Sequence, residues 1–408
     1  MSIFQELRKT AEKSFAALPL PASKDENYRF LGVDDSSPAL IFSGEKKSIV
    51  ESFLQEPCEE EAALLFVNGE EIQNKTTDKF PAQGIIFTDM LSAEKKHPQL
   101  LQSALVFAND FSDDLYAQLA KARFQNGVFL HVAENTKLEA PLRVVQWKND
   151  GAQAVRNVIV LEKNAELSLV EEYAGIENDN DSLAISVTEI MVKEGAKISY
   201  FPLQHYGKNT NFFHRLSIRA EKNAQVEIYP ISVGAYKGQY RFELNAVNSG
   251  ASFLTKGAAR GSAEQQFDFW VNMNHTVPET TSALDYWFVM GGKSKAIFNG
   301  MIRITKAAKN TVAYQKCRSL LLSSKATVHA IPKLEIATDE VKCNHGASIS
   351  TVNPEQVHYL QARGIPRSEA EKMIIRGFTE QVLEKLPTEA LYTRMDQYFT
   401  ENTAEVLH

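Results

Sequence analysis

The sequence predicts a mainly β protein with a solenoid core, a mixed α/β region before it and a small helical domain after it. Two observations carry this prediction. One turn-forming phrase recurs at near-regular intervals between residues 128 and 352, and clear helix boundaries follow residue 352. A chain of 408 residues is also longer than one small core usually serves, which favours several structural regions.

The N-terminal region, residues 1–127, begins with a helical pattern. Apolar residues recur there at spacings of three and four: Phe4, Leu7, Ala11, Phe15 and Leu18. This spacing predicts an amphipathic helix over residues 2–17 that docks by one face. Short apolar runs such as AALLFV then alternate with helical patterns such as DLYAQLAKARF, so we expect mixed α/β structure in this region.

The central region, residues 128–352, repeats a turn-forming Asn, Gly or Ser, a small or polar residue and then an alternating strand pattern. Equivalent points lie 29, 31, 28, 27, 44 and 31 residues apart: Thr136, Ala165, Ala196, Ala224, Ala251, Lys295 and Ala326. Strands and tight turns at one repeat length, without a helix between them, predict a β-helix whose coils stack on one another. A Greek-key sandwich is the open alternative. The 44-residue interval predicts either an extra strand pair or an insertion.

The C-terminal region, residues 353–408, has clear helix boundaries. Asn353 can cap a helix, Pro354 suits its first turn and Gly364 can end it. The next predicted helix has one apolar face, formed by Ala370, Met373, Ile374, Phe378, Val382 and Leu386. The segment TEALYTRMDQYFTEN predicts a third helix. A domain of about fifty residues has too small a core to be very stable alone, so we expect it to need a partner surface.

Composition and charge narrow the function classes. A formal net charge of −7 and a pI near 5.8 give no broad basic field, so we expect no nucleic-acid partner and no membrane partner. The N-terminus carries charges where a signal peptide needs an apolar run, and no stretch approaches the roughly 18 apolar residues of a spanning helix. Three cysteines without a CxxC pair predict a reduced cytoplasmic protein.

The common nucleotide-binding and hydrolase signatures are absent from the sequence. Residues 290–294, MGGKS, resemble the end of a phosphate-binding loop, but that pattern needs a glycine where Trp287 stands. A helix should also follow such a loop, whereas KAIFNGMIRI alternates like a strand. We therefore expect an ordinary turn here and no nucleotide bound by this chain.

Cys343 and His345 are the candidates for metal chemistry. Side chains two residues apart on a strand point to the same face, so these two can address one iron or zinc ion. A closed structural site needs four ligands, and the sequence does not mark the others. Two other interpretations stay open. Cys343 packs as a small apolar residue while His345 forms structural hydrogen bonds, or the two act as a Cys–His nucleophile.

Three motifs surround this pair: P-x-L-E-I at residues 332–336, D-x-V-x-C-x-H-G-A at 339–347 and Y-L-x-x-R-G-I at 359–365. Together they resemble the signature of the SufB/SufD family, the scaffold subunits of the SUF iron–sulfur cluster assembly system. Other segments extend the likeness over most of the chain: KDENYRF at 24–30, NHTVPETTS at 274–282 and FNGMIRI at 298–304.

Within that family the details favour the SufD branch. SufB-like chains carry glutamates beside the histidine and a cysteine in the following helix, whereas this chain has Asn344, Gly346 and Leu360 at those positions. Cys317 favours the SufB branch instead, because SufB-like chains have a cysteine at the same point of the segment that reads YQKCRS here.

The resemblance implies a fold, a cluster and a set of partners. It implies a right-handed parallel β-helix that pairs with a SufB-like subunit, and a helical domain that docks the SufC-like ATPase. His345 and Cys343 would then hold a transient iron–sulfur cluster shared with SufB. The residues that would contact the ATPase are Tyr359, Arg363, Gly364, Met373, Ile374 and Phe378.

Such a protein is a scaffold subunit rather than an enzyme, and a homodimer is the alternative assembly when SufB is absent. A second hypothesis is a purely structural partner that stabilises SufB and recruits SufC without ligating iron. A third is an unrelated β-helical enzyme acting on polysaccharide. The sequence has no paired array of Asp, Arg or Lys at the repeat spacing, which disfavours the third hypothesis.

Overall fold

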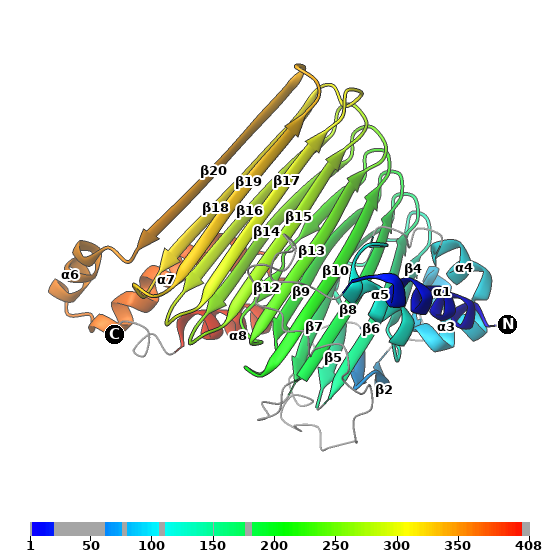
Figure 1. The fold of residues 1–408 in the computed structure, drawn as a ribbon, viewed down its shortest axis with the longest axis horizontal. Helices are drawn as coiled ribbons and strands as arrows, with labels where there is room; N and C mark the ends of the chain where they lie inside the picture. Colours follow the sequence, from blue (N-terminus) through cyan, green and yellow to red (C-terminus); the bar gives the residue numbers. More distant parts are fainter. Residues whose placement is uncertain are drawn as a thin grey trace.

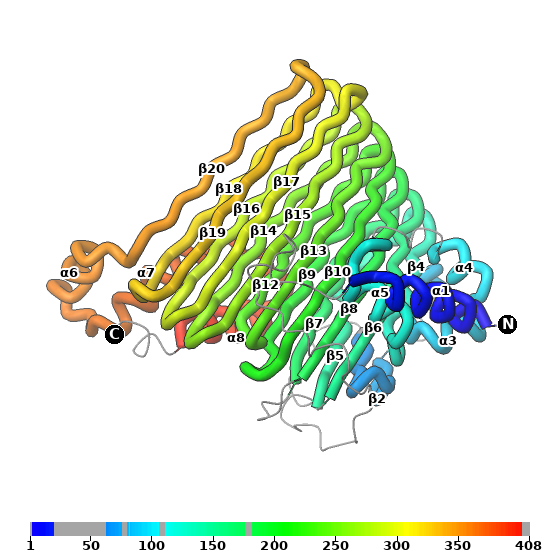
Figure 2. The backbone as a smooth tube through the Cα atoms, viewed as in Figure 1, coloured from blue at the N-terminus to red at the C-terminus, as the bar shows by residue number. Residues whose placement is uncertain are grey.

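The structure, a computed structural model, describes residues 2–19, 62–75, 80–105, 111–149, 151–175 and 182–401. Within these residues the chain forms two long β-sheets that face each other, with helices at the N-terminal end and beside one sheet (Figure 1). We call the eleven-stranded sheet A and the nine-stranded sheet B. From β4 onward the chain alternates between the two sheets, and Figure 2 shows the stacked coils that result.

Neighbouring strands run parallel in both sheets, except for the antiparallel pairs β1–β2 and β3–β4. Sheet A contains, in spatial order, β2 (Glu70–Lys75), β1 (Ala62–Val67), β5 (Leu142–Lys148), β7 (Glu166–Gly175), β9 (Lys197–His205), β11 (Gln225–Ile228) with β12 (Ile231–Ser232), β14 (Ser252–Gly261), β16 (Thr281–Met290), β18 (Thr311–Leu321) and β20 (Val341–Thr351). Sheet B contains β19 (Thr327–Ile336), β17 (Lys295–Ile304), β15 (Gln266–His275), β13 (Lys237–Ala246), β10 (Thr210–Ala220), β8 (Ser182–Val192), β6 (Ala152–Leu161), β4 (Val128–Val132) and β3 (Ile85–Asp89). The predicted parallel β-helix is confirmed. The Greek-key alternative is wrong, because it requires antiparallel neighbours.

Each coil adds one strand to each sheet, and the repeat length is regular through the 44-residue interval. Ser252 of β14 pairs with Thr281 of β16, and Gln266 of β15 pairs with Lys295 of β17, so both sheets advance by 29 residues. Ala251 precedes a strand of sheet A, whereas Lys295 begins a strand of sheet B. The prediction of an insertion or an extra strand pair is therefore wrong. The 44-residue interval is longer because its first point lies before a strand of sheet A and its second point lies at the start of a strand of sheet B.

The corner that leads from sheet B to sheet A has a left-handed backbone in seven successive coils. The residues with positive φ at this corner are Asn135, Asn164, Gly195, Asn223, Gly250, Glu279 and Asn310. Asparagine and glycine adopt this conformation at lower cost than other residues, which explains the recurring turn phrase. Asn164 Nδ2 also donates a hydrogen bond of 2.9 Å to Asn135 Oδ1 in the preceding coil. A Cβ on Gly195 would come within 2.4 Å of Asn164 Oδ1, so this corner needs a glycine for two reasons.

The space between the two sheets, which we call the lumen, is filled by one continuous apolar core. Aromatic rings of successive coils stack in it, as Tyr240 does on Phe269 with the ring centroids 4.3 Å apart. Nearer the N-terminal end the lumen also contains buried polar groups. Burial raises the pKa of Glu171 to about 7 and lowers that of His214 to about 3, so both groups carry less charge at neutral pH than in water.

Helices pack around the N-terminal coils. They are α1 (Ile3–Ala17), α3 (Met90–Lys96), α4 (Pro98–Leu105) and α5 (Leu115–Arg123), with the 3-10 helix η2 (Pro81–Gln83). The predicted N-terminal helix is confirmed, and it docks through Phe4 and Ala11, which are buried. The KDENYRF motif at 24–30 and Cys58 lie outside the described residues. No helix of the described ranges is long and apolar enough to cross a membrane.

Three helices follow the last strand: α6 (Pro354–Ala362), α7 (Arg367–Leu383) and α8 (Glu389–Thr400). Asn353 caps α6, because its Oδ1 accepts a hydrogen bond of 2.9 Å from the Glu355 N–H. Pro354 stands in the first turn of α6, and Gly364 with φ +84° follows its end, as the sequence predicts. The third predicted helix is α8.

Helices α7 and α8 pack on the outer face of sheet A. Their apolar side chains share one buried cluster with residues of sheet A, including Ile375, Val382, Leu391, Met395 and Phe399 from the helices and Val170, Phe201, Ile231, Trp287 and Leu320 from the sheet. The solenoid therefore supplies the surface that this small helical region needs. The predicted apolar face of α7 is wrong at Met373, which is 46% exposed, because the buried side passes through Ile375.

The two ends of the solenoid differ. At the N-terminal end, the edge strand of each sheet is antiparallel to its neighbour: β2 lies beside β1 in sheet A, and β3 lies beside β4 in sheet B. At the C-terminal end, β19 and β20 are the edge strands of sheets B and A, and the described chain adds no strand beyond them. Their side chains are mostly exposed or half-buried, and Ile336 and Ile349 are 40% and 51% exposed. We call this the open end of the solenoid.

Candidate functional site

Cys343 and His345 lie at the open end, on the edge strand β20. Strand register pairs Cys343 with Ala313 and His345 with Gln315 of β18, and both of these partners are fully buried in the lumen. Cys343 and His345 therefore point to one face, as their spacing predicts, and that face is the lumen side. Because no described strand covers β20, His345 remains exposed.

Cys343 is half-buried and packs against the core that fills the lumen. Burial raises the pKa of its thiol, outweighing the main-chain hydrogen bond from Ala313 that favours the thiolate. The thiol is therefore mainly protonated at neutral pH, and it would have to lose its proton to bind a metal.

His345 has the opposite character. Its imidazole is exposed and makes no hydrogen bond to the described part of the chain. A neutral imidazole with a free nitrogen lone pair can bind iron or zinc as one ligand. It binds iron less firmly than a thiolate does.

The chain does not assemble a closed metal site from its described residues. No three His, Cys, Asp or Glu side chains in this part of the chain converge closely enough to hold a metal ion. Closed structural sites have four ligands. A metal bound at His345 and Cys343 would therefore need further ligands from a second chain or from the bound species itself.

Cys317 lies in the coil beneath this pair. It is on the lumen side of β18, opposite Ala347 in register, and it is 1% exposed. Burial raises the pKa of its thiol to about 12, so the thiol is neutral over the physiological range. Its sulfur lies 4.0 Å from the Ser319 hydroxyl. As placed here, Cys317 is a core residue that solvent does not reach.

The residues expected to contact an ATPase fall into two groups. Tyr359, Met373 and Ile374 line an open groove between α6 and α7, together with Leu360 and Gly377. We call it the α6–α7 groove. Tyr359 is 57% exposed, so the groove presents aromatic and aliphatic surface to solvent.

The other three predicted contact residues have structural roles. The Arg363 guanidinium lies over the Tyr359 ring, 4.6 Å from its centroid, and so borders the groove. Gly364 turns the chain between α6 and α7 with φ +84°. Phe378 packs against the cluster between the helices and sheet A and does not line the groove.

The chain makes the expected turn at residues 291–294, directly after Met290 ends β16, and β17 follows it as a strand. No helix begins there, so the geometry of a phosphate-binding loop is not present at this position.

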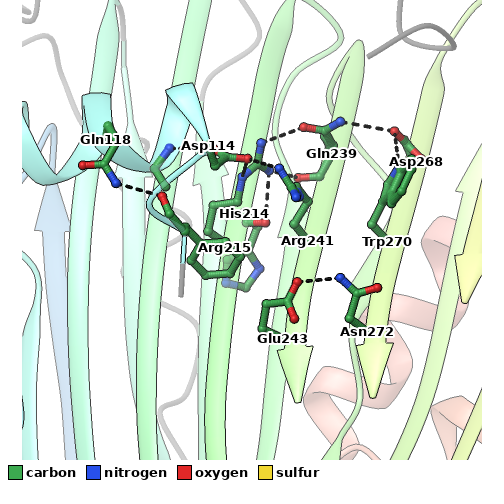
Figure 3. Close-up of polar contacts among 12 residues, drawn as sticks. Asp114, Gln118, His214, Arg215, Gln239, Arg241, Glu243, Asp268, Trp270 and Asn272 are labelled. Carbon is green, nitrogen blue, oxygen red and sulfur yellow. Dashed lines mark hydrogen bonds and ion pairs between the residues drawn. The ribbon is translucent and has the colours of Figure 1, made fainter. Parts of the chain in front are cut away.

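Sequence reasoning missed a polar network on the outer face of sheet B (Figure 3). Asp114 accepts hydrogen bonds from Arg215 Nε at 2.9 Å and Arg241 Nη1 at 2.7 Å, and it also caps α5. Burial opposes its ionisation, but the two arginines outweigh burial and lower its pKa. The network continues from Arg215 through Gln239 to Asp268. It fastens α5 to three successive coils.

The spacing of the coils in the sequence could have predicted this network. Arg215 pairs in register with Arg241, and Gln239 pairs with Asp268, so each polar residue recurs one coil later. Alignment of the coils against each other would have placed these residues in adjacent rows.

A second network fastens α8 to sheet A. Glu172 of β7 is fully buried and forms ion pairs with Arg143 of β5 and Arg394 of α8. His205 of β9 lies 3.5 Å from the same carboxylate. Burial opposes ionisation of Glu172, but the arginines outweigh burial and keep its pKa well below the usual range. The carboxylate is charged at every physiological pH.

Comparisons with known proteins cover most of the chain. Residues 144–378 match the family described as "SUF system FeS cluster assembly, SufBD core domain", and residues 57–144 match "SufBD protein N-terminal region". The chain is 29% identical to iron-sulfur cluster assembly protein SufD of Bacillus subtilis over 318 residues, 76% of this chain and 72% of that protein. It is 28% identical to SufB of the same organism over 323 residues, 78% of this chain and 69% of that protein. A SufBD family protein of Staphylococcus epidermidis is also 28% identical, over 75% of this chain and 66% of that protein.

Proposed function

Because the chain belongs to the SufB/SufD family of SUF iron–sulfur cluster assembly proteins, we propose that it is a SufD-like scaffold subunit. In this proposal it pairs with a SufB-like subunit, docks a SufC-like ATPase and helps to build a nascent iron–sulfur cluster. The cluster is the cargo of the assembly rather than a resident cofactor. The single observation that carries the proposal is the position of His345 at the open end of the solenoid.

The SufD-like assignment rests on three residues. Asn344 and Gly346 flank the histidine, and Leu360 stands where the resemblance puts a cysteine in SufB-like chains. The two Bacillus subtilis relatives, at 29% and 28% identity, do not separate the branches. Cys317 favours the SufB-like branch, but in this chain it is buried with a neutral thiol.

The open end supports pairing with a second solenoid. Among the described strands, nothing pairs with the outer edges of β19 and β20, and unpaired strand edges readily accept another strand. Ile336 and Ile349 add exposed apolar surface at the same end. A SufB-like β-helix that docks here would cover this surface and bring its own side chains close to His345. Such a docked chain would supply the ligands that the described residues of this chain lack.

The α6–α7 groove supports docking of the ATPase. It presents Tyr359 and Met373 to solvent beside a helix that few tertiary contacts hold, since only Val357 of α6 is buried. Helix α6 follows β20 after Val352 and Asn353 alone. A partner that moves α6 would therefore act directly on the strand that carries His345.

The first experiment is co-purification of this chain with its SufB and SufC partners, followed by measurement of iron and acid-labile sulfide per complex. We expect His345→Ala to lower both roughly tenfold, with the complex still assembled on a sizing column. His329→Ala is the matched control, because His329 is exposed on the neighbouring edge strand β19. Unchanged iron and sulfide in His345→Ala would favour the alternative, a structural partner that recruits SufC without ligating iron.

Two further points belong to the proposal. The ATPase, not this chain, would bind nucleotide, in keeping with the turn at residues 291–294. We place the assembly in the cytoplasm, because three cysteines without a CxxC pair suit a reducing compartment.

A further inference from the structure

A proline interrupts the outer edge of β19, the last strand of sheet B. In a parallel strand, the N–H and C=O of one residue point to one neighbouring strand, and those of the next residue point the opposite way. The Thr327 N–H donates to Ser294 O, just before β17, at 3.0 Å. Since the register with β17 is unbroken, the odd-numbered residues of β19 bond to β17 and the even-numbered ones point outward. Pro332 is even-numbered and has no N–H, so the outer edge lacks a donor near its middle.

The outer edge of β20, the last strand of sheet A, has no such interruption. The Val312 N–H of β18 donates to Thr280 O, just before β16, at 3.0 Å. Even-numbered residues of β18 therefore bond to β16, and odd-numbered ones bond to β20. The register of β18 with β20 then leaves the odd-numbered residues of β20 pointing outward. Each of them has an N–H to offer, and from residue 343 onward they are Cys343, His345, Ala347, Ile349 and Thr351.

A strand added to β19 would lie across the lumen from His345. Gln315 of β18 spans the lumen, because its Nε2 donates a hydrogen bond of 3.0 Å to the main-chain oxygen of Lys333 on β19. His345 is the register neighbour of Gln315, one strand farther out in sheet A. The matching place in sheet B lies one strand beyond Pro332 and Lys333. A strand at that place would cover the lumen face of His345.

Pro332 acts against such a strand without weakening the solenoid. Its nitrogen points away from β17, so the proline removes no bond between described strands. At the outer edge it offers no N–H, and its ring occupies the side from which an added strand approaches. Proteins use prolines on edge strands to prevent unwanted strand pairing. The two edges at the open end therefore differ in their capacity to accept a partner.

We propose that a strand of the SufB-like subunit adds to sheet A along β20, and that Pro332 keeps strands off β19 at the level of His345. This proposal rests on the proposed function. The added strand would bond to the outward main-chain groups of Cys343 and His345 and place its own lumen-side residues beside them. The side of the lumen opposite His345 would stay open for the cluster. Pairing through one sheet thus provides both a fixed partner and space for the cargo.

The direct test is hydrogen exchange at single-residue resolution on this chain, alone and in complex with the SufB-like subunit. The amides of Ala347 and Ile349 point outward from β20, so pairing there should slow their exchange roughly a hundredfold. The amides of Ala330 and Leu334 point outward from β19 and should change by less than about threefold. Equal protection at both edges would overturn the proposal, and so would a lack of protection at β20.

Two matched substitutions test the same point through binding. Ala347→Pro and Ala330→Pro each put a proline where the N–H points outward, so neither removes a bond to the neighbouring described strand. Ala347→Pro should lower co-purification of the SufB-like subunit by at least about tenfold, whereas Ala330→Pro should leave it unchanged. Thermal unfolding of each variant alone checks the fold. In folded variants, binding kept by Ala347→Pro or lost by Ala330→Pro would overturn the proposal. The exchange experiment on the unaltered chain depends on neither variant.

The role of Pro332 itself is tested by Pro332→Ala, which restores the missing N–H. In the complex, the Ala330 and Leu334 amides of this variant should gain roughly tenfold protection, because a strand can then pair with β19. Unchanged exchange at these two amides would overturn the role of Pro332. Cluster content separates this proposal from the proposed function. If His345→Ala keeps its iron and sulfide, the proposed function fails as to the cluster, while the exchange data still decide which edge pairs.

Discussion

Arg394 of α8 forms an ion pair with Glu172 of β7, although 222 residues separate them in the sequence. Helix α8 thereby attaches to a coil far from the open end, next to Arg143 of β5, which pairs with the same carboxylate. Together with the apolar cluster beneath α7 and α8, this attachment makes the two helices part of the solenoid. Helix α6 has far less buried surface and is the better candidate for movement.

Removal of this ion pair should loosen α8. Arg394→Met should lower the free energy of unfolding by about 2 kcal/mol, less than the 3–5 kcal/mol typical of a broken buried pair, because Arg143 still neutralises Glu172. Urea unfolding measures the loss, and hydrogen exchange should show faster exchange in α8. Lys385→Met is the control, since it breaks only an exposed pair with Glu384. An equal loss in both variants would show that the buried pair adds nothing.

The buried carboxyl of Glu171 should make stability depend on pH. Its folded pKa is raised from 4.5 to about 7 by burial, so between these values the folded protein keeps a proton that the unfolded chain releases. Stability therefore falls as pH rises through this range. Buried Asp268, whose pKa is raised to about 7 as well, should add to the same fall.

Glu171→Gln should remove part of this dependence. We expect its free energy of unfolding to exceed that of the unaltered protein by roughly 1–3 kcal/mol at pH 8, and by much less at pH 5. Urea unfolding at the two pH values gives the comparison. Glu166→Gln, which alters a half-exposed carboxylate on the same strand, should shift both values equally. A similar gain at pH 5 and pH 8 for Glu171→Gln would contradict the pKa argument.

The sequence was sufficient to predict the solenoid because the corner residues have a backbone task. Asn164 and Gly195 must adopt positive φ, and few residue types do so at low cost, so the turn leaves a visible repeat. The helix boundaries at Asn353 and Gly364 are visible for the same kind of reason. The backbone conformation of a turn or a helix end restricts the residue type at that position. It can therefore be predicted without knowing which other elements the segment contacts.

Contacts between distant elements could not be predicted in this way. The alternation around His345 showed that it shares a face with Cys343, but it could not tell whether that face is the lumen or the outside. Helical spacing put Met373 on the apolar side of α7, but it could not show that sheet A covers Ile375 and leaves Met373 exposed. These outcomes depend on which surface each element meets, and that surface lies elsewhere in the chain.

The α6–α7 groove should tolerate a charge without loss of fold. Met373 is exposed, so Met373→Glu should leave thermal unfolding of this chain within about 1 °C of the unaltered value, since exposed substitutions change stability little. In the proposed assembly the same variant should reduce co-purification of the ATPase at least tenfold, because a buried unpaired charge at an interface costs several kcal/mol. Ile72→Glu is the control, as Ile72 is equally exposed on β2. Full ATPase recovery with Met373→Glu would place the docking surface elsewhere.

The short connection between β20 and α6 should be required for coupling but not for docking. An inserted Gly-Gly-Ser between Val352 and Asn353 leaves both walls of the α6–α7 groove intact, so the ATPase should still bind. The insert behaves as a flexible chain and should no longer pass a displacement of α6 to the strand that carries His345. In the assembled complex, hydrogen exchange of the β20 amides should change on ATP addition for the unaltered chain and stay constant for the insertion. The same insert placed at Leu386–Pro387, between α7 and α8, is the control and should preserve the ATP response. An ATP response that survives insertion after Val352 would mean that the signal reaches β20 through the solenoid or across the SufB-like partner, and not through α6.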